Sequence, residues 1–204
     1  MPLFYQHNIN DNTQLAVWHI GEDENFFLEK VQLQKKINHP HKRLQHLAGR
    51  YLLQLLDPAF PVQAIEIAAS NKPLLTDNSL HFSISHCGNY AGAIVSNTKR
   101  VGIDLEIVTP KINFIRHKFL SEKELRLLPS VSNTLLTILW SCKEAVYKWY
   151  GHGGVDFKAH IHIDEVSMQE DGGVIRCKFL KDETENLTLY CKLFNKICLT
   201  WVEH

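Results

Sequence analysis

The chain has 204 residues, of which 45% are hydrophobic and 22% are charged, a composition that supports a folded core and excludes an intrinsically disordered protein. Lysine plus arginine and aspartate plus glutamate number 22 each, so the protein has no net charge that would attract nucleic acid or an anionic membrane. We therefore expect neither among its partners, and any anionic ligand must bind to a local cationic patch.

The cysteine pattern and the first residues predict a cytoplasmic protein with reduced thiols. The five cysteines are odd in number and include no C-x-x-C pair, which argues against a zinc site or a disulfide framework. The first eight residues lack the basic and apolar regions of a signal peptide. No apolar run approaches the ~18 residues that a membrane-spanning helix needs.

The first hundred residues predict a hairpin, a helix and a series of short strands. Residues 2–8 and 14–20 are expected to pair around a turn at residues 10–12. Residues 38–56 have apolar side chains at helical spacing and end at Asp57-Pro58. Antiparallel hairpins are the simplest pairing for the strands that follow, near residues 65–67, 80–85, 90–96 and 101–108.

The second half of the chain begins with helices and ends with strands. Ser121 and Glu124 have the spacing of a capping box, which predicts a short helix there. Residues 133–150 form the longest predicted helix, which glycines at 151–154 end. The remaining strands are predicted at residues 161–166, 173–180 and 187–202. This order of elements favours an α+β fold over a parallel βαβ sheet.

Two carboxylates stand in the predicted strand Val101–Glu106. Residues two apart on a strand face the same side, so Asp104 and Glu106 converge. Such a pair repels itself unless a cation lies between the carboxylates, which favours a hard divalent ion such as Mg²⁺. A solvated strand face with two ordinary acids explains this segment equally well.

A third carboxylate lies on the longest predicted helix. Glu144 and Lys148 are four residues apart and share one face of it. They form either an ordinary surface ion pair or a further metal ligand beside a phosphate-binding lysine, a combination typical of phosphoryl chemistry. A separate segment, His81–Gly88, alternates like a strand and runs into a glycine turn, where His86 can equally be an ordinary strand-end histidine.

Four segments in order resemble the signature of the 4′-phosphopantetheinyl transferases, and most closely their larger, monomeric, surfactin-type class. They are Lys72-Pro73, Phe82–His86, Gly102–Glu106 and Trp140–Lys148. The resemblance covers roughly residues 40–155. It implies a monomer that is a single unit of residues 1–204, with two similar α+β lobes related by pseudo-twofold symmetry. Each lobe, about residues 1–100 and 101–204, would pack a helix on a small antiparallel sheet, with coenzyme A bound in the cleft between them.

The activity that the resemblance implies is transfer of 4′-phosphopantetheine from coenzyme A to a serine of an apo acyl or peptidyl carrier protein, with release of 3′,5′-ADP. The reaction would need Mg²⁺, with Mn²⁺ as the alternative hard ion. The nucleophile then belongs to the partner, in keeping with the lack of a recognisable Ser/His/Asp or Cys/His arrangement. Two alternatives are a Mg²⁺-dependent coenzyme A pyrophosphohydrolase and an inactive module that binds coenzyme A or carrier protein.

The resemblance also assigns roles to residues. The metal carboxylates are Asp104, Glu106 and Glu144, and Lys148 would contact the pyrophosphate. Glu124 stands at the position of the glutamate proposed as general base for the carrier serine, with Glu122 as its rival. A structural role for Glu124 in the capping box is the competing interpretation.

A further group would contact coenzyme A: Lys72, Pro73, Ser85 and His86. The family arginine for the 3′-phosphate aligns with Gln45 here, so Arg50 is the favoured replacement and Arg43 the second. Asn71 replaces the usual glycine before Lys-Pro, a mild change because asparagine adopts similar turn conformations.

The segment Thr109–Leu120 alternates basic and apolar residues, and the resemblance makes it the surface that receives the carrier protein. The predicted docking residues are Lys111, Ile112, Phe114, Arg116 and Lys118. A cationic and apolar patch suits a small acidic helical partner. The alternative is a solvated loop with Ile112 and Phe114 turned into the core.

Overall fold

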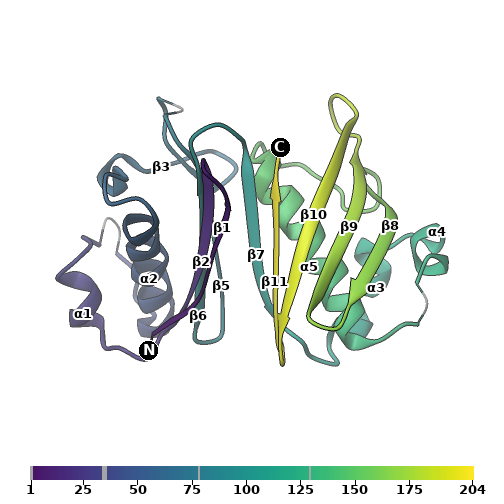
Figure 1. Ribbon diagram of the computed structural model, residues 1–204, viewed down its shortest axis with the longest axis horizontal. Helices are drawn as coiled ribbons and strands as arrows, with labels where there is room; N and C mark the ends of the chain where they lie inside the picture. The colour runs from purple at the N-terminus through teal and green to yellow at the C-terminus, as the bar shows by residue number, and fades with distance from the viewer. Residues whose placement is uncertain (1, 34–35, 78, 129) are drawn as a thin grey trace. The chain divides into compact units, whose positions relative to one another are not determined.

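The computed structural model describes residues 2–33, 36–77, 79–128 and 130–204 and divides the chain into two compact units, Met1–Val101 and Gly102–His204 (Figure 1). Each unit packs a long helix against a sheet with antiparallel strand pairs, so the predicted α+β class is confirmed. No helix in the described part of the chain is long and apolar enough to cross a membrane.

The first unit contains a four-stranded antiparallel sheet. Its strands, in spatial order, are β1 (Leu3–Asn10), β2 (Thr13–His19), β6 (Tyr90–Ser96) and β5 (His81–Cys87). The predicted hairpin is therefore confirmed as β1 and β2. A separate two-stranded ladder pairs β3 (Glu66–Ile67) with β4 (Pro73–Leu74), after the short 3₁₀ helix Val62–Ala64.

Helix α2 (Pro40–Leu56) packs on this sheet and confirms the predicted helix. Its apolar face contributes Leu47, Leu52 and Leu53 to the core of the first unit. Gly49 allows the close approach to β5, because a Cβ there would lie 2.6 Å from Cγ2 of Ile84. A short helix that was not predicted, α1 (Glu24–Leu28), packs against α2.

The second unit is built on a five-stranded sheet. Its strands, in spatial order, are β7 (Val101–Ile107), β11 (Ile197–Glu203), β10 (Glu185–Phe194), β9 (Gly172–Phe179) and β8 (Ile161–Gln169). One strand was predicted over 187–202, which is wrong: β10 and β11 form a hairpin around Asn195-Lys196, with Asn195 at φ +55°. The predicted hairpin pairing of the strands 90–96 and 101–108 is also wrong, since β7 pairs with β11 and not with β6.

Helix α5 (Asn133–Tyr150) covers the sheet of the second unit and has the predicted bounds. Ser132 caps its first turn, and Gly151 ends it at φ +79°, a conformation that glycine adopts without strain. Its apolar stripe is buried in the core and consists of Leu135, Leu139, Cys142, Val146 and Trp149. Two short helices precede it: α3 (Ile112–Phe119), which was not predicted as a helix, and α4 (Glu122–Arg126), which begins with the predicted capping box.

Candidate functional site

The predicted metal carboxylates come from two elements that approach closely, β7 and α5. A Cβ on Gly102 of β7 would lie 2.0 Å from the carbonyl oxygen of Ala145 and 2.8 Å from the backbone nitrogen of Trp149. Both atoms belong to the backbone of α5, so glycine is required for this approach. The approach brings side chains of α5 within reach of the carboxylates on β7.

Asp104 is buried on β7 and has partners from α5 on both oxygens. Lys148 forms an ion pair with Oδ1 at 2.7 Å, and the Ser141 hydroxyl donates to Oδ2 at 2.8 Å. The Ser141 hydroxyl also lies 2.8 Å from the Thr200 hydroxyl. These contacts compensate the cost of burying the carboxylate. Lys148, predicted either to pair with Glu144 or to bind phosphate, contacts Asp104 here.

Glu106 and Glu144 lie close enough to Asp104 for its charge to oppose their ionisation. The indole N–H of Trp140 donates to Oε1 of Glu106 at 2.9 Å. Burial, followed by the charge of Asp104, raises the pKa of Glu106. Burial, followed by the charge of Asp104, raises the pKa of Glu144 to about 7, and Lys148 only partly opposes this. The charge of Asp104 thus disfavours the ionised forms of both glutamates.

This donor set has the chemistry that a hard divalent cation requires, because carboxylate oxygens are the ligands that Mg²⁺ prefers. The raised pKa values of Glu106 and Glu144 mean that their negative charge is incompletely compensated. Among the described residues, however, no three acidic, histidine or cysteine side chains already lie together as a ligand group. The carboxylates fit the metal in kind, and their role as its ligands stays a prediction.

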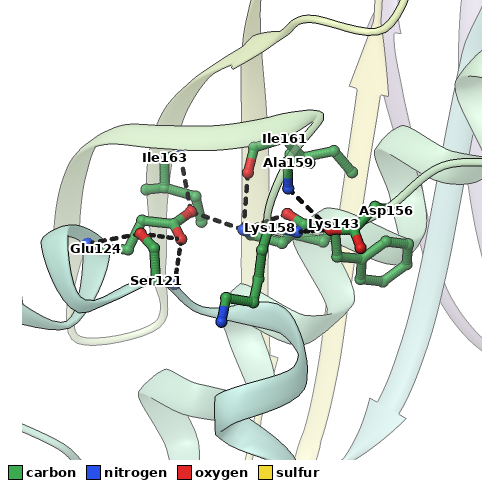
Figure 2. Close-up of polar contacts among 9 residues, drawn as sticks. Ser121, Glu124, Lys143, Asp156, Lys158, Ala159, Ile161 and Ile163 are labelled. Carbon is green, nitrogen blue, oxygen red and sulfur yellow. Dashed lines mark hydrogen bonds and ion pairs between the residues drawn. The ribbon is translucent and has the colours of Figure 1, made fainter.

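Glu124 lies elsewhere in the second unit, and its structural role in the capping box is confirmed. It is 2% exposed. Figure 2 shows its carboxylate between Ser121, which starts α4, and the ammonium group of Lys143 on α5. The rival carboxylate, Glu122, is exposed on the same helix.

The first unit contains a pocket of about 430 Å³ that holds several of the predicted coenzyme A residues. It is lined by Ile37, Lys42, Gln45, His46, Arg50, Ile67, Asn71, Pro73, Ile84 and His86. Burial lowers the pKa of Arg50 to about 10, and its guanidinium lies 3.1 Å from Nδ1 of His46. Asn71 has φ +66°, the turn conformation expected for the residue that replaces glycine.

Three other predicted coenzyme A residues do not line this pocket. Arg43 is bound to Glu24 through two nitrogens at 2.6 Å and to the carbonyl of Ile37. Ser85 is buried on the face of β5 opposite to His86, because strand neighbours alternate. Lys72 precedes the pocket residue Pro73, and burial, followed by the charge of Arg100, lowers its pKa to about 8.

The predicted docking segment divides into exposed and buried residues. Phe114 is 78% exposed on α3, and the cations Lys111, Arg116 and Lys118 of the same segment are exposed as well. The prediction that Ile112 is a docking residue is wrong, since its side chain packs into the core of the second unit. The helical twist explains the difference, because positions two apart on a helix face different sides.

A comparison with protein-family models finds the 4′-phosphopantetheinyl transferase superfamily over residues 100–201, half of the 204-residue chain. The chain belongs to this superfamily. The matched range contains Asp104, Glu106, Glu144 and Lys148. The residues of the pocket in the first unit lie outside it.

Two curated relatives are similar to part of this superfamily member. It is 30% identical over 129 residues to the 4′-phosphopantetheinyl transferase HetI of Nostoc sp., a match that covers 56% of this chain and 54% of HetI. It is 33% identical over 117 residues to the protein named "Putative 4′-phosphopantetheinyl transferase slr0495" of Synechocystis sp., a match that covers 52% of this chain and 48% of that protein. The chain spans about half the length of the curated relatives it matches.

Several residues that build the site were not predicted. Trp140, Ser141 and Lys143 belong to the recognised motif, but a linear motif does not show which carboxylate each side chain meets. Lys42 and His46 line the pocket with Arg50. Their spacing of four residues places all three on one face of α2, a signal that could have identified them.

Proposed function

We propose that this protein transfers the 4′-phosphopantetheine arm of coenzyme A to a serine of an apo acyl or peptidyl carrier protein and releases 3′,5′-ADP. The observation that carries the proposal is the grouping of Asp104 and Glu106 on β7 with Glu144 and Lys148 on α5. Membership of the superfamily and the names of both relatives support the same reaction class. We further propose that the protein acts as a cytoplasmic monomer, like the class it resembles.

Phosphoryl transfer requires that negative charge be neutralised at the pyrophosphate. Asp104, Glu106 and Glu144 would hold Mg²⁺, which supplies positive charge beside the pyrophosphate when it is bound. Lys148 would exchange its contact with Asp104 for the leaving phosphate, whose charge grows in the transition state. The carrier serine oxygen forms a bond to the phosphorus that bears the pantetheine arm, and the bond from that phosphorus to 3′,5′-ADP breaks.

We assign the nucleotide end of coenzyme A to the pocket of the first unit. Arg50 is the better candidate than Arg43 for the 3′-phosphate, because Arg50 lines the pocket and Arg43 is bound to Glu24. Burial disfavours the charged form of Arg50, so a phosphate beside it would stabilise that charge. His86 lines the same pocket, and Lys72 stands next to the pocket residue Pro73.

The carrier protein would dock on α3 and its surroundings. Phe114 offers an exposed apolar anchor, and Lys111, Arg116 and Lys118 offer positive charge to an acidic partner. The serine proton must pass to a base. Of the two predicted carboxylates, Glu122 is exposed and Glu124 is buried, so Glu122 is the one that a partner can reach without rearrangement of α4.

The test is intact-mass analysis of an apo acyl carrier protein and an apo peptidyl carrier domain after incubation with this protein, coenzyme A and Mg²⁺. A gain of about 340 Da that EDTA abolishes would establish metal-dependent transfer. Release of 3′,5′-ADP without a carrier would instead support the pyrophosphohydrolase. Binding of coenzyme A with no reaction would support the inactive module.

Glu144→Gln is the variant that tests the metal assignment. The amide keeps the size of the side chain, and the raised pKa of Glu144 indicates that the fold tolerates a neutral group there. We expect transfer to fall by about a hundredfold or more while the thermal midpoint is kept. Glu170→Gln makes the same chemical change on the exposed turn after β8 and should leave transfer unchanged. Equal transfer by both variants would contradict the metal assignment.

A further inference from the structure

Lys143 is a fully buried cation with three partners. Its side chain is 0% exposed, and its Nζ lies 2.6 Å from Oε1 of Glu124. The same ammonium donates to the carbonyl oxygen of Ile161 at 2.8 Å (Figure 2). It also donates to the carbonyl oxygen of Phe157 at 2.8 Å. All three N–H donors of the lysine are therefore used.

Glu124 is satisfied to the same degree. Its Oε1 accepts from Lys143 and from the backbone N–H of Ile163 at 3.0 Å. Its Oε2 accepts from the backbone N–H of Ser121 at 2.7 Å and from the Ser121 hydroxyl at 2.8 Å. A carboxylate has about four acceptor directions, and groups of this chain occupy all four. The arrangement offers no direction from which a partner's serine could donate its proton.

The ion pair completes the edge of a sheet. Strand β8 is the outer strand of the five-stranded sheet, and its residues Ile161 and Ile163 pair with β9 on the inner side. On the outer side, where no further strand of the described chain pairs with β8, the carbonyl of Ile161 accepts a hydrogen bond from Lys143 and the N–H of Ile163 donates one to Glu124. Through these contacts the pair joins α4, α5 and β8.

A second chain of contacts links Lys143 to the carboxylate site. The carbonyl of Phe157 binds Lys143, and the ring of Phe157 packs against Trp140 with centroids 5.5 Å apart. Trp140 in turn donates to Glu106. Glu144 is the next residue of α5 after Lys143. The pair is thus connected to the docking segment through α4 and to the carboxylates through Phe157 and α5.

We propose that Glu124 and Lys143 are positioning residues: their buried ion pair fixes α4, the segment 111–120 before it and the Phe157 backbone against α5. This inference rests on the proposed function, since it concerns how the carrier protein and the carboxylates are presented for transfer. It differs from the predicted role of Glu124 as general base, because a positioning pair needs its two partners to match and needs no free carboxylate.

The experiment compares Glu124→Leu, Lys143→Met and the double variant in the carrier-protein assay. Removal of one partner leaves a buried charge unpaired, so each single variant should lower kcat/KM for the carrier protein about tenfold or more. The double variant buries neither charge and should regain part of that loss, because only the contacts to the backbone of Ser121, Phe157, Ile161 and Ile163 are then missing, with the KM for coenzyme A unchanged throughout. If Glu124 is the base, the double variant will be as inactive as Glu124→Leu, which would overturn the proposal.

Controls separate this role from general destabilisation. Arg176 and Glu165 form an exposed ion pair between β9 and β8. Glu165→Leu, Arg176→Met and their double variant should have small, additive effects on kcat/KM. Thermal unfolding of every variant shows whether it is folded. If a single variant unfolds, Glu124→Gln provides the second measurement: a base would lose the acidic limb of the kcat–pH profile, whereas a positioning residue would keep it.

The outcomes also distinguish this inference from the proposed function. Wild-type protein that modifies no carrier would count against the function. Active wild-type protein with an inactive but folded double variant would count against the positioning pair alone. Recovery in the double variant would support both.

Discussion

Replacement of Gly102 by alanine tests the central claim that a close approach of β7 and α5 builds the carboxylate site. The new Cβ would lie 2.0 Å from the carbonyl oxygen of Ala145. That separation is about 1.4 Å short of ordinary van der Waals contact. The colliding atoms belong to the helix backbone, so rotation of a side chain cannot relieve the clash. Either β7 or α5 must move.

The size of the effect follows from this overlap. Overpacking of a core costs about 1–3 kcal/mol. For a unit of roughly 100 residues, each kcal/mol lowers the thermal midpoint by about 4–8 °C, so we expect a fall of roughly 5–20 °C. Movement of α5 also shifts Glu144 and Lys148 relative to Asp104, and a displacement near 1 Å can lower turnover by about a hundredfold.

Thermal unfolding and the carrier mass-shift assay measure the two effects on the same protein samples. Gly21→Ala is the matched control, because a Cβ at Gly21 would meet nothing within 4 Å and the position has no positive φ. The control should change stability by less than about 1 kcal/mol. If Gly102→Ala behaves like Gly21→Ala in both assays, the close approach does not determine the site and the reasoning fails.

Three further predictions concern the cations, the docking surface and the core. Burial lowers the pKa of Lys72 to about 8, so the affinity for coenzyme A, measured by calorimetry, should weaken as pH rises through that value. In Lys72→Arg the affinity should stay constant over the same pH range. If the wild type and this variant show the same dependence of affinity on pH, Lys72 does not contact coenzyme A. Phe114→Asp should raise the KM for carrier protein more than the KM for coenzyme A, whereas Leu28→Asp, on the first unit, should change neither. If the two variants have the same KM for carrier protein, the carrier protein does not dock at Phe114. Thiol titration of the native protein should find Cys87 reactive and the other four cysteines protected until unfolding, because burial raises the pKa of all four; more than one fast thiol would contradict the core.

The elements that could be predicted from sequence are those whose local signals agree. Residues 133–150 combine an apolar stripe, a capping serine and a terminal glycine, so the bounds of α5 could be predicted. Helix α3 has only eight residues and buries two of them, Ile112 and Phe119, which is too little periodicity to identify a helix. The turn between β10 and β11 lacks glycine, and Asn195 alone is a weak signal among strand-forming residues.

The candidate site could be predicted as a set of residues but not as a set of contacts. Strand alternation places Asp104 and Glu106 on one face, and helical spacing does the same for Glu144 and Lys148. Spacing within one element does not show that Lys148 meets Asp104, because that contact depends on how α5 packs on β7. For the same reason, the burial of Glu124 could not be predicted from its capping box, since its ionic partner lies 19 residues away.

Glu144 provides a test of the proposal that this cluster holds a metal ion. Its pKa in the folded protein is raised to about 7, above the 4.5 of an ordinary glutamate, because burial and Asp104 disfavour its ionised form. As pH rises from 4.5 to 7, Glu144 loses its proton in the unfolded chain but keeps it in the folded protein, so the free energy of unfolding falls over that interval. Above pH 7 the loss of stability is complete. The cost is a few kcal/mol at most, on the scale of about 1.4 kcal/mol for each pKa unit. In EDTA, the free energy of unfolding of the wild type should therefore fall relative to that of Glu144→Gln between those pH values, and parallel curves would show that Glu144 bears no such strain. A residue that destabilises the metal-free fold in this way is expected where a bound cation uses its charge.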